Sequence, residues 1–116
     1  YSEQITKASK VKDEIHKSNL WEIGPSHDKI HSAVFPQELC DRIIKYYSFK
    51  DDLVLDPFAG SGTFGKAALK RERNFFLIEI YKKYFEDMRK KIKPISETQN
   101  QIDFIDEKKF AKSLNL

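Results

Sequence analysis

Two short, mostly apolar segments, Leu53–Leu55 and Phe75–Ile80, constrain this chain most strongly, because a glycine-rich turn and a run of helix formers separate them. Each apolar run is short enough to predict a buried strand, and Thr63–Arg71 between them predicts a helix. A strand, a turn, a helix and a second strand form a βαβ unit, whose strands are parallel. We therefore expect an α/β protein with an open parallel sheet.

Helical periodicity extends this unit on both sides. Apolar residues follow Pro36 in one stripe as far as Tyr47, which predicts a helix that ends near Ser48. A second stripe runs from Tyr81 to Pro94 and predicts another helix. Weaker patterns predict a helix over Ile5–His16, a loop over Ser18–Phe35, a strand over Ile102–Ile105 and a helix over Glu107–Leu114.

The length of 116 residues fits about one domain, and the formal charge of +3 does not identify a partner by itself. The longest apolar run, Phe75–Ile78, is too short for a membrane helix, which needs about 20 residues. Cys40 is the single cysteine, which excludes an intrachain disulfide or a multi-cysteine zinc site. These features predict a cytoplasmic chain in a reducing compartment without a membrane partner.

The glycine turn fits two nucleotide-binding signatures incompletely. Gly60, Gly62 and Gly65 match the dinucleotide fingerprint, with an acid nineteen residues after the first glycine, but four residues separate that glycine from the strand. Lys66 follows at the spacing of an NTPase phosphate loop, but Ala67 stands where a hydroxyl would hold Mg²⁺. Both signatures stay as alternatives.

A third interpretation uses the residues that the first two ignore. Asp56 at the strand end can orient the turn or reach a cationic group, and Glu79 after the next strand can accept hydrogen bonds from a ribose diol. Two acids near one site suit a cationic nucleoside without phosphates better than NAD or ATP. S-adenosylmethionine is such a ligand.

Three segments in order resemble DNA methyltransferases that modify exocyclic amines. The run DPFAGSGT from Asp56 to Thr63 resembles the D-P-F-x-G-S-G-T motif of that family. Upstream, Lys29–Pro36 resembles its H-P-A-x-F-P segment, and Phe76–Ile80 resembles the strand that carries its ribose-binding acid. With their surroundings these matches cover Trp21–Ile92. The resemblance therefore implies a partial Rossmann-like fold of S-adenosylmethionine-dependent methyltransferases, part of an open sheet with helices on both faces.

The resemblance also implies which residues bind the cofactor. The backbone of His31–Phe35 and the turn at Gly60–Thr63, with Asp56 and Phe58, would hold the methionine end and the sulfonium. Glu79 would bind the ribose hydroxyls, and Ile80 would flank the adenine. The expected cofactor-binding residues are His31, Ser32, Ala33, Phe35, Asp56, Phe58, Gly60, Ser61, Gly62, Thr63, Glu79 and Ile80.

The catalytic loop of this family, (Asp, Asn or Ser)-Pro-Pro-(Tyr or Phe), has no counterpart, because the sequence contains no Pro-Pro pair. In the beta class the catalytic loop and the DNA-recognition region precede the cofactor segments. The chain therefore resembles the C-terminal half of a beta-class enzyme, inactive alone, and its apolar surface is expected to be exposed or covered by a partner. The missing half would lie upstream on the same chain or on another chain.

The resemblance predicts three parts: an N-terminal helical segment or linker over 1–18, a cofactor-binding subdomain over 19–94 and a polar extension over 95–116. The expected partners are DNA, through the complete enzyme, and the catalytic half; a homodimer stays open. Adenine N6 is preferred over cytosine N4 as the target. The rival function is a docking half or a remnant that does not take part in catalysis.

Several residues admit simpler interpretations. His27 and His31 lie four apart, but in a Gly-Pro loop, which does not predict a metal site. Cys40 is expected in the core. The aromatic residues could stack on bases, but core packing is favoured, and the basic helix flank favours a solvated face over phosphate contacts. The aromatic residues are Tyr46, Tyr47, Phe49, Phe75 and Phe76, and the basic flank is Lys82, Lys83, Arg89, Lys90, Lys91 and Lys93.

Overall fold

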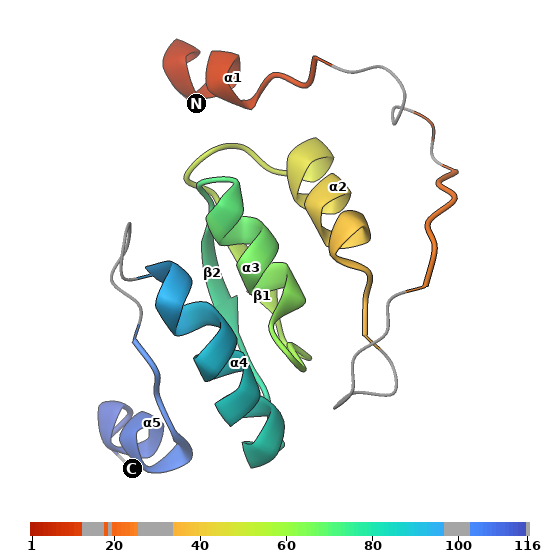
Figure 1. Cartoon of the computed structure of the whole chain (residues 1–116). Coiled ribbons are helices and arrows are strands. Elements are labelled where there is room, and N and C mark those ends of the chain that lie inside the picture. The colour runs from red at the N-terminus through yellow and green to blue at the C-terminus, as the bar shows by residue number, and fades with distance from the viewer. Residues whose placement is uncertain (13–17, 19, 26–33, 97–102, 116) are drawn as a thin grey trace.

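The computed structural model describes residues 1–12, 18, 20–25, 34–96 and 103–115 (Figure 1). Its described elements confirm the α/β order expected from the sequence. They are α1 (Glu3–Ser9), α2 (Gln37–Tyr47), β1 (Leu53–Asp56), α3 (Thr63–Lys70), β2 (Asn74–Leu77), α4 (Lys82–Ser96) and α5 (Glu107–Ser113). No described helix is long and apolar enough to cross a membrane.

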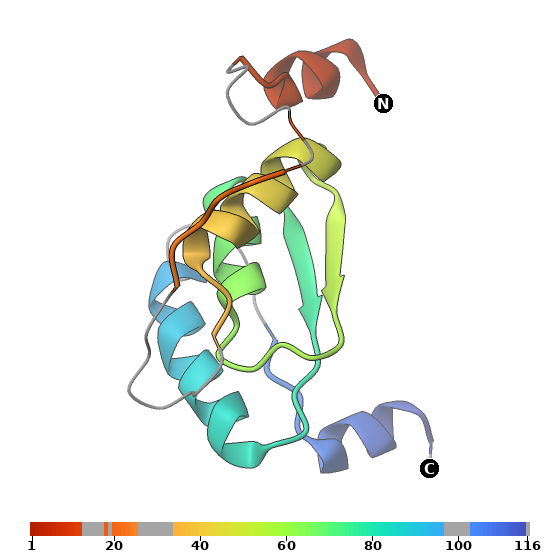
Figure 2. The same cartoon turned by 90° about the vertical axis from the view of Figure 1, so that its right-hand side faces the viewer.

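The predicted βαβ unit is confirmed. Strands β1 and β2 pair in parallel, with Leu53 opposite Asn74 and Asp56 opposite Leu77. Helix α3 connects them and contacts both strands as well as α2 and α4. All three helices lie on one side of the two strands (Figure 2).

Small side chains on α3 let its neighbours pack closely. Ala67 and Ala68 are buried against Cys40 and Ile44 of α2, which confirms the core position expected for Cys40. Burial raises the pKa of the Cys40 thiol to about 12. A second cluster joins Ala59, Leu69, Met88 and Ile92 and fixes α4 against α3.

Among the described residues, no helix covers the opposite face of the sheet, so the expectation of fully buried strands is wrong for them. Side chains alternate between the two faces of a strand. Val54, Phe75 and Leu77 point toward the helices, whereas every second residue points away. The exposed apolar residues of this face are Leu53 (67% exposed), Leu55 (62%), Phe76 (51%) and Ile78 (47%).

Core packing was also expected for Tyr47 and Phe49, and both side chains are exposed. Tyr47 is the last residue of α2. The Phe49 ring instead stacks on Tyr1, with 4.5 Å between ring centroids. Tyr46 is half-buried, and its ring lies 5.9 Å from that of Trp21.

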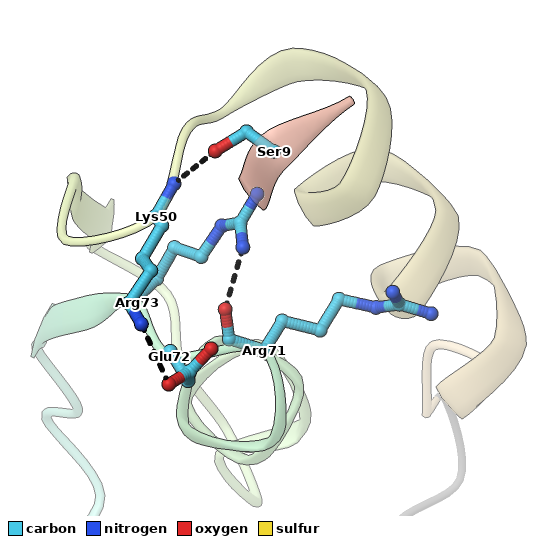
Figure 3. Close-up of polar contacts among 5 residues, drawn as sticks. All are labelled: Ser9, Lys50, Arg71, Glu72 and Arg73. Atoms are coloured by element: carbon cyan, nitrogen blue, oxygen red, sulfur yellow. Dashed lines mark hydrogen bonds and ion pairs between the residues drawn. The ribbon is translucent and has the colours of Figure 1, made fainter. Parts of the chain in front are cut away.

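A polar cluster closes the amino ends of the strands (Figure 3). The backbone N–H of Lys50 donates to Ser9 Oγ at 2.8 Å, and Lys50 Nζ lies 2.9 Å from Glu72 Oε1. The buried Arg73 guanidinium donates to the carbonyl oxygens of Arg71 and Ser48. These contacts tie the end of α1 to the sheet at the end opposite the glycine turn.

Several element boundaries differ from the sequence expectations, among them the ends of α1, α4 and β2. Helix α1 ends at Ser9 rather than at His16, because Lys10 is extended; residues 13–17 lie outside the described part. Helix α4 continues past Pro94 to Ser96. Strand β2 ends at Leu77 rather than at Ile80, because β1 has no residue beyond Asp56 to pair with.

The strand predicted over Ile102–Ile105 is wrong for Asp103–Ile105, while Ile102 lies outside the described residues. Phe104 packs against α4 instead, with its ring 6.3 Å from that of Phe85. The helix predicted at Glu107–Leu114 is confirmed as α5, whose amino end is capped by Asp106 accepting from the Lys109 N–H at 2.9 Å. The described residues of the predicted loop Ser18–Phe35 contain no helix or strand.

Candidate functional site

The glycine turn lies at the carboxyl ends of β1 and β2, the edge where parallel α/β sheets bind ligands. Asp56 ends β1, and its Oδ1 accepts the backbone N–H of Phe58 at 3.0 Å. This local bond turns the chain away from the strand. The contact is consistent with the first of the two roles expected for Asp56, orienting the turn, and its approach to a cationic ligand group stays a prediction.

The chain between Asp56 and Gly60 forms a wide turn rather than a tight one. The Ala59 N–H donates to the Ile78 carbonyl at 2.9 Å, and the Ala59 side chain is buried in the core. The residue just before the first glycine is therefore hydrogen-bonded to the segment that follows β2. This geometry disagrees with the dinucleotide fingerprint, in which the first glycine follows the strand directly.

The three glycines have different physical roles. Gly62 has φ +81° and a Cβ there would lie 2.6 Å from Met88 Cγ. A Cβ on Gly65 would lie 2.4 Å from Leu77 Cδ1, so both positions let α3 approach its neighbours closely. Gly60 also has positive φ, +54°, but no atom of the described residues lies within 4 Å of its Cβ position. Gly60 is therefore the glycine that presents backbone to open space, where a ligand can approach.

Glu79 joins the turn to the end of β2. Its Oε2 accepts the Gly60 N–H at 2.7 Å, and its Oε1 accepts the Tyr81 N–H at 2.8 Å. The structure thus brings together two segments whose proximity the sequence spacing only suggested. An ionised carboxylate offers about four acceptor positions, so each oxygen of Glu79 can still accept a hydrogen bond from a hydroxyl group.

The remaining predicted site residues differ in exposure. Phe58 (87% exposed) and Ile80 (89%) present apolar surface on either side of the turn. Ser61 is buried, whereas Thr63 is half-buried with its Oγ1 3.4 Å from Ser61 Oγ. Both hydroxyls lie at the amino end of α3, where the helix dipole favours negative charge.

Phe35 is held near the turn by α3. Its ring contacts the Phe64 ring edge-on, with 5.9 Å between centroids, although more than half of its surface is exposed. The predicted residues His31, Ser32 and Ala33 lie outside the described residues, so their placement stays a prediction. Among the residues that the structure describes, no group of three His, Cys, Asp or Glu side chains could hold a metal. His27 also lies outside that part.

The sequence did not reveal two features of this site. The Glu79 contacts with Gly60 and Tyr81 depend on tertiary placement, although the spacing of nineteen residues was a partial signal. The packing of Gly62 and Gly65 against Met88 and Leu77 had no signal beyond the glycines themselves.

The fold and the turn define a class of protein that comparison with known sequences identifies. The model of the N6/N4 methyltransferase family, described as DNA methylase, matches residues 1–90, so the chain belongs to that family. It is 37% identical over 83 residues to the orphan methyltransferase M.BamHII of Bacillus amyloliquefaciens, an alignment that covers 65% of this chain and 31% of the relative. It is 40% identical over 97 residues to the type II methyltransferase M.BglI of Bacillus subtilis, covering 74% and 27%.

A solved structure shares the fold. TTHA0409 of Thermus thermophilus, assigned as a DNA modification methylase and solved with S-adenosyl-L-methionine, superposes with a TM-score of 0.70 at 28% identity. The match covers 82% of this chain and 38% of that protein. The chain thus spans less than a third of the length of the two methyltransferases above.

Proposed function

We propose that this chain is the S-adenosylmethionine-binding, C-terminal part of a beta-class DNA methyltransferase. The contact between Glu79 and the Gly60 N–H carries the proposal, because it unites the ribose-binding acid and the glycine turn in one site. The similarity to TTHA0409, which was solved with this cofactor, supports the same ligand. When bound, the cofactor would supply an electrophilic methyl group on a sulfonium.

In this proposal, different residues of the chain contact different parts of the cofactor. Asp56 and the backbone of Gly60 face the methionine end and the cationic sulfonium, while the free acceptor positions of Glu79 take the ribose hydroxyls. The exposed side chains of Phe58 and Ile80 offer apolar surface, with Ile80 placed against the adenine. His31–Phe35, Ser61, Gly62 and Thr63 complete the methionine end.

The chemistry of the turn favours this ligand over the two phosphate-bearing alternatives. Two carboxylates, Asp56 and Glu79, border the turn and would repel a pyrophosphate. Packing against Met88 and Leu77 accounts for the glycines at positions 62 and 65, so neither position requires a phosphate to explain it. Ala67 provides no hydroxyl for Mg²⁺.

Methyl transfer to DNA would require the other half of the enzyme. The target base must leave the duplex, and its amine must be held by acceptors beside the methyl group. In this family the Pro-Pro loop does that work, and this sequence lacks it. We propose adenine N6 as the target, ahead of cytosine N4, with the catalytic and recognition half upstream on the same chain or supplied by another.

The bare face of β1 and β2 supports the need for a second half. Four large apolar side chains, Leu53, Leu55, Phe76 and Ile78, form one exposed patch. Contiguous apolar patches of this kind mark interaction surfaces in soluble proteins. In this proposal, the rest of the methyltransferase sheet and its helices would cover them.

Calorimetry with S-adenosylmethionine, NAD and ATP tests the ligand. We expect heat of binding with S-adenosylmethionine alone, and Glu79→Ala should weaken it about tenfold or more, since it removes hydrogen bonds with a charged acceptor. Glu22→Ala, an exposed acid away from the turn, is the matched control. Binding of NAD or ATP only, or equal affinities for Glu79→Ala and Glu22→Ala, would contradict the assignment.

A mixing experiment separates the proposal from its rival, a docking half or remnant. The chain is combined with a polypeptide that carries the Pro-Pro loop, and methyl transfer to DNA is measured with labelled cofactor. Activity in the mixture, absent from either part, supports a complementing half. A cofactor-binding chain that never restores activity would support the docking role instead.

A further inference from the structure

The positive charge of the chain is concentrated on one helix. Between Lys82 and Ser96, α4 carries six basic and two acidic residues, a net charge of +4. The whole chain has a net charge of +3, so the rest of it carries −1. The basic surface therefore belongs to α4 and not to the protein in general.

The packing of α4 directs part of this charge outward. Met88 and Ile92 are buried against α3 and fix the inner face of the helix. At 100° per residue, Lys82, Lys83 and Lys90 fall within about 100° of one another on the other side. All three are exposed, and none makes an ion pair among the described residues. We call these three residues the α4 lysine face.

The two acids of α4 neutralise this face only partly. Asp87 is half-buried, and its Oδ2 is fully enclosed with no hydrogen-bond partner among the residues that the structure describes, so that atom is hidden from the outer surface. Glu86 is also half-buried, but it lies one turn from both Lys82 and Lys90 and offsets part of their charge. Arg89 is engaged with the Phe104 ring, 5.5 Å from its centroid.

We infer that the α4 lysine face binds the phosphate backbone of duplex DNA, independently of sequence. The inference rests on the proposed function, which makes DNA the substrate of the complete enzyme. Lys82 and Lys90 are separated by eight residues, or about 12 Å along the helix axis, a span that reaches more than one phosphate of a strand. Lysine provides a compact positive charge that binds phosphate.

The composition of the face favours duplex DNA over two other anionic surfaces. An amphipathic helix that enters a membrane needs bulky apolar side chains beside its basic ones, and Lys82, Lys83, Glu86 and Lys90 include none. Single strands are bound through aromatic stacking, and this face has no aromatic residue. A surface that can bind only phosphates matches the regular phosphate backbone on the outside of a duplex.

The experiment measures binding of the full chain to a 20-base-pair duplex by fluorescence anisotropy at several salt concentrations. Three phosphate contacts should give a slope of log affinity against log salt of about −2.7, a loss of about 40-fold between 50 and 200 mM salt. The variant Lys82→Gln/Lys83→Gln/Lys90→Gln should lose most of that slope. The matched control is Lys108→Gln/Lys109→Gln/Lys112→Gln, which removes three exposed lysines of α5 and should keep the slope.

Circular dichroism of both variants checks that they are folded, and calorimetry with S-adenosylmethionine is run in parallel. Normal cofactor binding with no duplex binding by the unmodified chain overturns the inference and leaves the proposed function standing. Duplex binding without cofactor binding overturns the proposed function and leaves the inference about the α4 lysine face standing. Equal loss of slope in the two triple variants, or tighter binding to vesicles with 30% phosphatidylserine than to the duplex, also overturns it.

Discussion

Gly62→Ala should destabilise the chain far more than Gly60→Ala, although both glycines have positive φ. A left-handed conformation costs an alanine about 1–2 kcal/mol, and both variants incur that cost. At Gly60 the described part of the chain places nothing else within 4 Å, whereas the new Cβ at Gly62 would lie 2.6 Å from Met88 Cγ. Overpacking adds about 1–3 kcal/mol, so we expect about 1–2 kcal/mol for Gly60→Ala and about 2–5 kcal/mol for Gly62→Ala.

Urea unfolding followed by circular dichroism measures these differences, with Gly24→Ala as the control. Gly24 lies in open space without a positive φ, so its substitution should change the free energy of unfolding by less than about 0.5 kcal/mol. Met88→Ala removes the atom in closest contact, and Gly62→Ala should cost less in that background. Equal costs for Gly60→Ala and Gly62→Ala, or no coupling to Met88, would refute the reasoning.

Three further perturbations test other parts of the structure. The Phe49 N–H, and then the Tyr1 hydroxyl, lower the pKa of Asp52 in the folded chain below the value of 3.8 in the unfolded chain. The stability that this shift contributes is therefore complete above pH 3.8 and disappears as pH falls through the lower pKa of the folded chain. We expect Asp52→Asn to flatten the acid limb of a pH–stability curve. Burial raises the pKa of Cys40 to about 12, so a thiol reagent at pH 8 should react only as the chain unfolds, and immediate labelling would contradict the packing. Leu55→Lys/Phe76→Glu places opposite charges on two exposed cross-strand partners, so it should change the stability of the isolated chain by less than about 0.5 kcal/mol. The same variant should weaken pull-down of a Pro-Pro-bearing half by more than about tenfold.

The sequence was sufficient for the βαβ unit because its signals are local. Apolar runs, a glycine turn and a periodic helix each specify their own element, and the parallel pairing follows from the connection between them. The same local signals could not tell which face of the strands is covered. Leu55 and Val54 are equally apolar, yet one is exposed and the other packs against the helices.

The candidate site was predictable to the extent that a motif names its residues. Asp56, Gly60 and Glu79 do come together, as the motif order implied. Which glycines serve packing and which one is open to a ligand was not predictable, because these roles depend on contacts with Met88 of α4 and Leu77 of β2. Packing partners that are distant in sequence leave no trace in a local pattern.

The bare sheet face has a consequence for the order in which the protein is made. Chains emerge from the ribosome amino end first, and domains fold as they appear. A catalytic half encoded upstream on the same polypeptide would already be folded when Leu53 and Leu55 are synthesised, and would shield them at once. If the catalytic half were translated from a separate messenger RNA, these strands would stay exposed until the two halves met, and they could pair with other partly folded chains. Linked translation of the two halves would therefore reduce aggregation as well as assemble the enzyme.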